Sequence, residues 1–360
     1  MYGVGIVGCG VIGTRLAAAF DEHERTAVRV ACDRDAERAR GLAAEYDCAA
    51  VTSVDEILGV GDVDVVYVGV PPKHHAPVVR AALAADRDVI CEKPIAETAA
   101  VGRELTALAE DSGRVTAINF PFRYTPGFLE LRERVASGAI GRPLRVSLRF
   151  RFPRWPREWQ DVAWLEGREQ GGPLREVGSH FVFGTLELFG AIGGVHSRVR
   201  WRGAGAAEES IVATFLAGAA DSDDMAGAAG SGDDAGAADP GDGAGGFEGT
   251  ALDDSPFEPV ESEPVHGTID LLCDGAGREE NSLIVEGTEG SLALREWRRL
   301  VADPGEDDER VITAEPGETS RRLIDEFVTA MDGEDGDLVS FEAATRVQAV
   351  VDEVLGIDAP

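Results

Sequence analysis

The sequence predicts a two-domain α/β protein: an N-terminal doubly wound parallel sheet, then an α+β domain whose sheet is open and mostly antiparallel. Three observations lead to this prediction. The chain of 360 residues is long for a single domain. Its first 120 residues alternate strand-like and helix-like segments, a pattern that implies right-handed crossovers in a parallel sheet. After residue 190, strand-like segments follow one another without helices between them.

The first element is a short apolar strand over residues 3–7, which runs into a glycine-rich turn and a helix over residues 16–20. The turn fits the pattern G-x-G-x-x-G. Its first glycine makes the tight turn, the second lets a pyrophosphate approach the backbone, and the third lets the helix pack on the strand. A phosphate would then lie at a helix N-terminus, where free N–H groups favour an anion. The predicted cofactor contacts here are Gly8, Cys9, Gly10, Val11, Ile12 and Gly13.

The second strand, residues 28–32, ends in an acid. Asp33 follows Gly13 by 20 residues, the offset expected of a carboxylate that binds a ribose 2'-hydroxyl. A carboxylate repels a 2'-phosphate, so NAD is the first choice of cofactor. Arg34 could accommodate that phosphate if Asp33 swings away, which keeps NADP as the second choice.

The rest of the first domain continues the alternation to about Phe120. Residues 63–70 form a nearly continuous apolar run, as expected of a parallel strand covered on both faces. Thr98 is placed to cap a helix. The expected segments are helices 35–46, 54–58, 75–85 and 98–112, and strands 63–70, 88–91 and 115–119.

The second domain, residues 121–360, changes character. Helices are expected at residues 128–135 and 178–189, and two more, 319–331 and 341–355, finish the chain. Alternating or apolar runs predict strands at residues 144–152, 195–201, 210–215, 267–273, 282–286 and 290–294.

Residues 219–263 form an acidic insertion in this domain. They are mostly Gly, Ala, Asp and Ser, with 13 acidic residues and no basic one. Such a segment buries too little apolar area to offset its ordering entropy, so we expect a solvated loop. Calcium binding is a minor alternative, because the spacing of the acids is not that of an EF-hand.

Composition restricts the possible partners. The net charge of −32 excludes a nucleic-acid-binding surface and suits a halophilic cytoplasm, where salt screens self-repulsion. No apolar run reaches transmembrane length and no signal-type N-terminus is present, so we expect a cytoplasmic protein without a membrane partner. The five cysteines lack metal-type spacing and are expected to be buried thiols. We expect no metal site.

The order of motifs along the chain resembles the Gfo/Idh/MocA family of sugar-type NAD(P)-dependent oxidoreductases. The matching stretches are GCGVIG, VPPKHH, VICEKPIA, NFPFRYTPGFLELRERVASGAIGRP and GGPLREVGSHF, which together span nearly the whole chain outside the acidic insertion. The resemblance implies a Rossmann domain and substrate binding between two domains. It also implies a homo-oligomer formed through the open sheet, and a carbohydrate or polyol substrate.

Lys93 is the first candidate catalytic residue. It is one of only two lysines in the chain, with Lys73, and it follows a parallel strand at the edge where doubly wound sheets bind ligands. An ammonium there can polarise a substrate oxygen. Glu92, Lys93 and Pro94 match the family's E-K-P element, whose lysine lies beside substrate and nicotinamide. The alternative is a surface lysine on a turn.

Glu176 and His180 match the family's D-x-x-x-H element, with His180 as the candidate general base. Residues four apart share a helix face, so we expect Glu176 to hydrogen-bond to His180, fix its tautomer and raise its basicity. A base poised near neutrality would suit removal of a hydroxyl proton. The alternative is a packed histidine near a helix start.

Two positions depart from the family pattern. Glu176 stands where aspartate is usual, and Phe183 occupies a place where many members carry another aspartate. We expect a substrate pocket that is less polar than a typical sugar site.

Further candidates follow the same motifs. Val70, Pro71 and His75 end another parallel strand, near the expected path of the nicotinamide ribose, although a turn role for His75 is equally expected. Arg123, at the domain junction, could face the substrate or pair with an interdomain acid. Trp159 could stack on a sugar ring and Arg157 could clamp a carboxylate, unless their loop is simply pinned to the sheet.

The function predicted from these residues is hydride transfer between NAD(P) and a secondary alcohol or the anomeric carbon of a sugar. His180 would be the base, Lys93 the electrophilic helper and Glu176 the orienting group. Two alternatives remain open: an NAD-dependent glycosidase that oxidises its sugar transiently, and a nucleotide-sensing protein without turnover.

Overall fold

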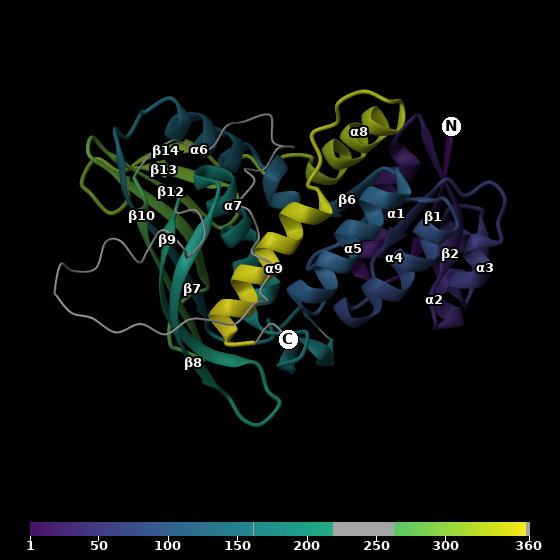
Figure 1. Cartoon of the computed structure of the whole chain (residues 1–360), viewed down its shortest axis with the longest axis horizontal. Coiled ribbons are helices and arrows are strands. Elements are labelled where there is room, and N and C mark those ends of the chain that lie inside the picture. Colours follow the sequence, from purple (N-terminus) through teal and green to yellow (C-terminus); the bar gives the residue numbers. More distant parts are fainter. Residues whose placement is uncertain (161, 219–262, 358–360) are drawn as a thin grey trace, which may run out of the picture.

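The computed structural model describes residues 1–160, 162–218 and 263–357. It contains two sheets that lie side by side, with helix α9 (Phe341–Leu355) running between them (Figure 1). The predicted fold class is confirmed, because the first sheet is parallel and the second is mostly antiparallel. The predicted solvated loop and the calcium alternative, apart from Glu263, lie outside the described residues.

The first sheet has the strand order β3-β2-β1-β4-β5-β6, and all of its pairs are parallel. This order reverses between β1 and β4, so the carboxyl ends of these strands open a crevice where doubly wound sheets bind ligands. The sequence pattern did not reveal the short β3. The strands are β1 (Tyr2–Val7), β2 (Thr26–Cys32), β3 (Ala49–Val51), β4 (Val65–Val68), β5 (Asp88–Glu92) and β6 (Thr116–Asn119).

Helices cover both faces of this sheet. Side chains such as Leu16 and Phe20 of α1 pack on one face, and those of α4 and α5 pack on the other. The capping predicted for Thr98 is confirmed, since its Oγ1 accepts a hydrogen bond from the Val101 amide at 3.4 Å. The helices of this part are α1 (Val11–Glu22), α2 (Ala36–Glu45), α3 (Val54–Leu58), α4 (His75–Ala84) and α5 (Ala99–Ser112).

The second sheet has the order β14-β13-β12-β11-β7-β10-β9-β8, and only β10 with β7 is parallel among its described pairs. The sequence pattern did not reveal β13 or β14. The strands are β7 (Pro143–Phe152), β8 (Ile192–Trp201), β9 (Glu208–Ala217), β10 (Val265–Cys273), β11 (Glu280–Gly287), β12 (Ser291–Arg295), β13 (Arg299–Ala302) and β14 (Arg310–Thr313).

One face of this sheet packs against α6 (Pro126–Ala136) and α7 (Ser179–Phe189), whose side chains share a core with it. Among the described residues no helix is seen to cover the other face, and β7 alternates buried and exposed residues accordingly. Exposed apolar side chains such as Val212 and Leu272 lie on it. The homo-oligomer predicted through this sheet stays a prediction.

Helix α8 (Thr319–Met331) belongs to the second half of the sequence but packs on the first sheet. Its side chains Leu323, Ile324 and Phe327 share a core with Leu16 and Phe20 of α1. Figure 1 shows α8 beside α1, away from the second sheet. The division at residue 120 therefore separates the two sheets, but α8, from beyond that division, packs with the helices of the first sheet.

The helix expected from residue 178 begins earlier. A π-helical turn, Leu174–Gly178, precedes α7, and it carries Glu176 just before the helix that carries His180. In the described part of the chain, no helix is long and apolar enough to cross a bilayer.

Candidate active site

A cavity of about 980 Å³ lies at the carboxyl edge of the first sheet and extends to residues of the second domain. Gly8, Gly10 and Asp33 line it at one end, and Glu176 and His180 belong to its lining as well. Segments more than 140 residues apart in sequence therefore share one wall.

The glycine turn has the shape that a dinucleotide requires. Gly8 has φ +100°, and a Cβ there would lie 2.3 Å from the Gly69 carbonyl oxygen. A Cβ on Gly13 would lie 1.8 Å from the Gly8 oxygen, so only glycine allows helix α1 this close to β1. Nothing lies within 4 Å of a Cβ on Gly10, and this open space is where a pyrophosphate would approach.

Of the six residues predicted as cofactor contacts in this turn, four line the cavity: Gly8, Gly10, Val11 and Ile12. Cys9 and Gly13 do not. The Cys9 amide donates to Asp33 Oδ2 at 2.9 Å, and the buried Cys9 thiol has its pKa raised to about 12, chiefly by burial. These two residues shape the turn instead of reaching into the cavity.

Asp33 and Arg34 both line the cavity. The Asp33 carboxylate accepts hydrogen bonds from the amides of Cys9 and Asp35, each at 2.9 Å. It is therefore held in place at the end of β2. Arg15, Arg38 and His74 also line the cavity, and the motif did not single them out.

Val70 and Pro71 line the cavity, but His75 does not. Its buried ring lies between the carbonyl oxygens of Val70 and Pro94, at 2.7 and 2.8 Å. Burial lowers the pKa of His75 to about 4. The cofactor contact predicted for His75 is wrong, because the ring starts helix α4 pointing into the interior.

Glu92 lines the cavity from the end of β5. Its Oε1 accepts hydrogen bonds from the Tyr67 hydroxyl at 2.7 Å and from Asn119 Nδ2 at 2.6 Å. Burial raises the pKa of Glu92. The network joins β4, β5 and β6, and both Glu92 and Asn119 line the cavity.

Lys93 and Glu176 form an ion pair in the cavity wall. Lys93 Nζ lies 2.8 Å from Glu176 Oε2 and 2.7 Å from the Glu176 carbonyl oxygen. Gln160 Nε2 donates to the other carboxylate oxygen at 3.2 Å. The π-helical turn thus presents both the side chain and the main chain of Glu176 to the same ammonium.

His180 lies in an aromatic cage. Its ring centroid is 4.8 Å from that of Trp297 and 5.3 Å from that of Phe120. The side chain is 4% exposed, and Nδ1 has no hydrogen-bond partner among the described residues. Burial, aided by the charges of Lys93 and Arg157, lowers its pKa well below the usual value.

The predicted hydrogen bond from Glu176 to His180 is therefore wrong, and so is the raised basicity. The π-helical turn and the charge of Lys93 direct the carboxylate elsewhere. Phe183 is buried and its ring stacks on Phe120, 4.9 Å between centroids, so it supports the cage.

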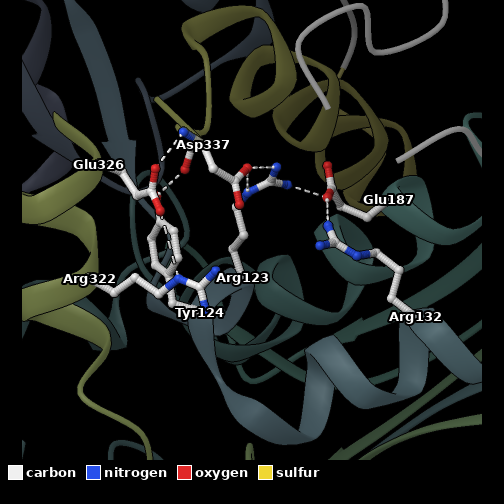
Figure 2. Close-up of polar contacts among 7 residues, drawn as sticks. All are labelled: Arg123, Tyr124, Arg132, Glu187, Arg322, Glu326 and Asp337. Atoms are coloured by element: carbon white, nitrogen blue, oxygen red, sulfur yellow. Dashed lines mark hydrogen bonds and ion pairs between the residues drawn. The ribbon is translucent and has the colours of Figure 1, made fainter. Parts of the chain in front are cut away.

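Arg123 does not face a substrate. Figure 2 shows it between Asp337 on one side and Glu187 on the other, with Arg132 paired to Glu187. Arg123 is 1% exposed and absent from the cavity lining. Arg123 therefore pairs with acids, as the second alternative expected, but both acids lie in residues 121–360, on the same side of the predicted domain boundary as Arg123.

Arg157 and Trp159 both line the cavity. Trp155, in the same loop, is buried and donates from Nε1 to the Leu165 oxygen at 3.1 Å, so the loop is also pinned. The sequence patterns missed Trp297 and the α8 residues Thr319 and Ser320, which line the cavity too. No periodicity marks them, because their place depends on the tertiary fold.

Comparisons with known proteins agree with this geometry. Residues 2–120 match the model of an oxidoreductase family with an NAD-binding Rossmann fold, and residues 128–229 match a Gfo/Idh/MocA C-terminal domain. A dTDP-3,4-didehydro-2,6-dideoxy-alpha-D-glucose 3-reductase of Streptomyces violaceoruber is 33% identical over 60% of this chain and 61% of that protein. An inositol 2-dehydrogenase of Acidothermus cellulolyticus is 35% identical over 42% of this chain and 46% of its own. The chain thus spans less than two thirds of the length of these curated relatives.

Solved structures share the fold across nearly the whole chain. An oxidoreductase from Thermotoga maritima aligns with a TM-score of 0.76 and 20% identity, covering 98% of this chain and 95% of its own. A 3-ketoreductase from Actinomadura kijaniata, in complex with NADP and TDP-benzene, aligns with a TM-score of 0.73 and 19% identity over 98% and 96%.

The fold joins a parallel Rossmann sheet, within residues that match an NAD-binding Rossmann fold, to a second and mostly antiparallel sheet. The chain belongs to the Gfo/Idh/MocA oxidoreductase family.

Proposed function

We propose that this protein is an NAD(P)-dependent oxidoreductase that transfers a hydride between nicotinamide and a carbon bearing a hydroxyl or keto group in a sugar or polyol. One observation carries the proposal. A single cavity holds a dinucleotide-shaped turn with Asp33 and also holds Lys93, Glu176 and His180. The sugar reductase and the polyol dehydrogenase among the relatives support the substrate class.

A nicotinamide bound in this cavity would accept or supply the hydride, so the protein must manage the proton on the substrate oxygen. Lys93 is the group we place there. Two of its protons are donated to Glu176, and its remaining donor is available to the substrate. Lys93 thus polarises the oxygen. In reduction it gives its free proton to that oxygen, and in oxidation it takes the hydroxyl proton as it passes one of its own protons to the Glu176 carboxylate.

Glu176 neutralises Lys93 and orients it from two atoms. Its carboxylate is a quarter exposed and also accepts from Gln160, so it offers a path for the proton toward solvent. Glutamate at this position therefore serves Lys93. Glu176 was predicted to orient His180, whereas here we propose that its longer side chain orients Lys93.

His180 contributes as a neutral ring. Its lowered pKa makes it a poor base near neutrality, and its aromatic cage excludes water from this wall. We assign it to orient the substrate oxygen by a hydrogen bond, with proton transfer left to Lys93.

The test is turnover in molar salt with NAD or NADP and a panel of polyols and aldoses, followed by reduced cofactor with keto sugars. The substitution Lys93→Met should lower kcat/KM by about a hundredfold or more, which is the usual contribution of acid-base catalysis. The matched control is Lys73→Met, because this other lysine is exposed and lies outside the cavity lining.

The proposal would be contradicted if the protein turned over neither the oxidised nor the reduced cofactor, or if Lys93→Met kept full activity. Release of an aglycone from a nitrophenyl glycoside without net reduced cofactor would instead identify the glycosidase. Tight cofactor binding with no turnover of any kind would identify the nucleotide sensor.

A further inference from the structure

We propose that the substrate carries an anionic group, a carboxylate or a phosphate, which binds the guanidinium of Arg157 inside the cavity. This inference rests on the proposed function and narrows its substrate class from neutral sugars and polyols to sugar acids or sugar phosphates.

The first observation is an unfilled set of donors. The Arg157 side chain is 10% exposed and lines the cavity. Its Nε donates to Glu279 Oε1 at 2.9 Å, but its two Nη groups have no hydrogen-bond partner among the described residues. These Nη groups are not among the buried unpaired atoms, so they are open to the cavity, where a ligand with two acceptor oxygens could bind both.

The second observation is rigidity. The Arg157 guanidinium lies 5.2 Å from the ring centroid of Phe152 and 5.8 Å from those of Trp155 and Trp159. Trp155 is itself fixed by its hydrogen bond to Leu165. A fork held between rings loses little entropy on binding, and its planar geometry matches carboxylate and phosphate oxygens.

The third observation places this guanidinium beside the Lys93–Glu176 pair. Gln160 Oε1 accepts from the Arg157 amide at 3.2 Å, and Gln160 Nε2 donates to Glu176 Oε1 at 3.2 Å. His180 lines the same cavity, and the charge of Arg157 helps to lower its pKa. We therefore assign the oxyanion that Arg157 binds to the substrate, while the glycine turn would hold the cofactor phosphates.

In the described part of the chain, the nearby acids do not occupy the two Nη groups of Arg157. Glu279 occupies the Nε side, Glu176 is paired with Lys93, and Glu92 is bound to Tyr67 and Asn119. Trp159, which is 68% exposed, adds an aromatic face on which a sugar ring can stack while its anionic group reaches Arg157.

The experiment measures binding by intrinsic tryptophan fluorescence in NAD-loaded protein at constant salt. The probes are gluconate for a carboxylate, glucose 6-phosphate for a phosphate, and sorbitol and glucose as neutral parents. We expect at least one anionic probe to bind tenfold or more tightly than its parent, and the preferred anion then identifies carboxylate or phosphate.

The preference should fall below threefold in Arg157→Gln and only partly in Arg157→Lys, which keeps the charge without the fork. Arg154→Gln is the matched control, because Arg154 lies in the same loop and is 71% exposed. Thermal unfolding and NAD binding establish that each variant is folded.

Equal binding of anionic and neutral probes, or a preference that survives Arg157→Gln, would overturn the inference. Turnover of neutral polyols without any anion preference would leave the proposed oxidoreductase standing while removing Arg157 from it. Absence of turnover with every probe would instead count against the proposed function.

Discussion

At the residue scale, we propose that Asp33 sets the choice of cofactor. Two backbone amides hold its carboxylate, at 2.9 Å each, beside the exposed Arg34 at the cavity wall. The swing that would admit a 2'-phosphate next to Arg34 therefore breaks both hydrogen bonds. A fixed carboxylate beside a 2'-phosphate is a like-charge contact, which costs several kcal/mol.

We predict that Asp33→Ser raises the NADP to NAD ratio of kcat/KM by at least about tenfold, since 1.4 kcal/mol corresponds to one decade. The gain should disappear in Asp33→Ser with Arg34→Gln, because the cation that receives the phosphate is then gone. Steady-state kinetics with both cofactors give the ratio. An unchanged ratio in the single variant would show that another group excludes the phosphate.

His75 ties two elements together. It begins α4, and its ring bridges the carbonyl oxygens that follow β4 and β5. Two carbonyl acceptors favour the charged ring, but complete burial outweighs them and lowers the pKa to about 4. The folded protein therefore keeps this histidine neutral where an unfolded chain would protonate it.

The sign of the pH effect follows from that difference. Below pH 6.5 the unfolded chain binds a proton on His75 that the folded protein does not bind. The stability that the neutral, buried ring contributes is therefore fully present above pH 6.5 and is lost as the pH falls toward 4. This contribution to the free energy of unfolding is about 3 kcal/mol, because each unit of pKa difference corresponds to about 1.36 kcal/mol.

We predict that the free energy of unfolding of His75→Gln falls less steeply between pH 6.5 and 4 than that of the unmodified protein. The difference in slope should correspond to the uptake of about one proton on unfolding. Exposed His266 supplies the control as His266→Gln, which should keep the original slope. Denaturant titrations across this range measure both. A steeper slope in His75→Gln would mean that the folded ring is charged.

The π-helical turn before α7 shows a second effect of an element on the site. The pattern E-V-G-S-H predicts a shared helix face for Glu176 and His180, and a regular helix would give one. The wider turn, Leu174–Gly178, instead presents Glu176 to Lys93 and leaves His180 in its aromatic cage.

Arg123 acts on the molecule as a whole. It follows β6, reaches Glu187 on α7, and reaches Asp337 between α8 and α9 (Figure 2). The Tyr124 hydroxyl also donates to the backbone carbonyl oxygen of Asp337 at 2.8 Å. β6, α7 and α8 each carry a residue that lines the cavity, namely Asn119, His180 and Thr319, so the cluster connects elements that form its wall.

We predict that Arg123→Met lowers the free energy of unfolding by about 3 kcal/mol, because Asp337 loses its cation partner and buried Glu187 keeps only Arg132. Added salt should not restore it, since buried pairs are poorly screened. The control is Arg134→Met, whose partner Glu130 is a partly exposed neighbour on α6 and whose loss should cost within about 0.5 kcal/mol. Equal losses in the two variants, measured by chemical denaturation, would contradict the assignment.

Much of the fold was readable from local pattern. The limits of α3, α8 and α9 agree with the predicted ones, because helical spacing of apolar residues marks them strongly. Strands β3, β13 and β14 were missed, since three or four residues are too few to show a period. The packing of α8 against α1 across the predicted domain boundary leaves no local trace.

The sequence by itself determined the parallel Rossmann sheet, the mostly antiparallel second sheet, and the glycine turn with its acid. Each of these depends on short-range spacing and backbone sterics, which neighbouring residues settle among themselves. Tertiary structure alone decided that Glu176 pairs with Lys93, that His180 stays neutral, that His75 and Arg123 turn inward, and that Trp297 joins the wall. Burial and charge at these positions come from side chains far away in the chain, and no local spacing encodes them.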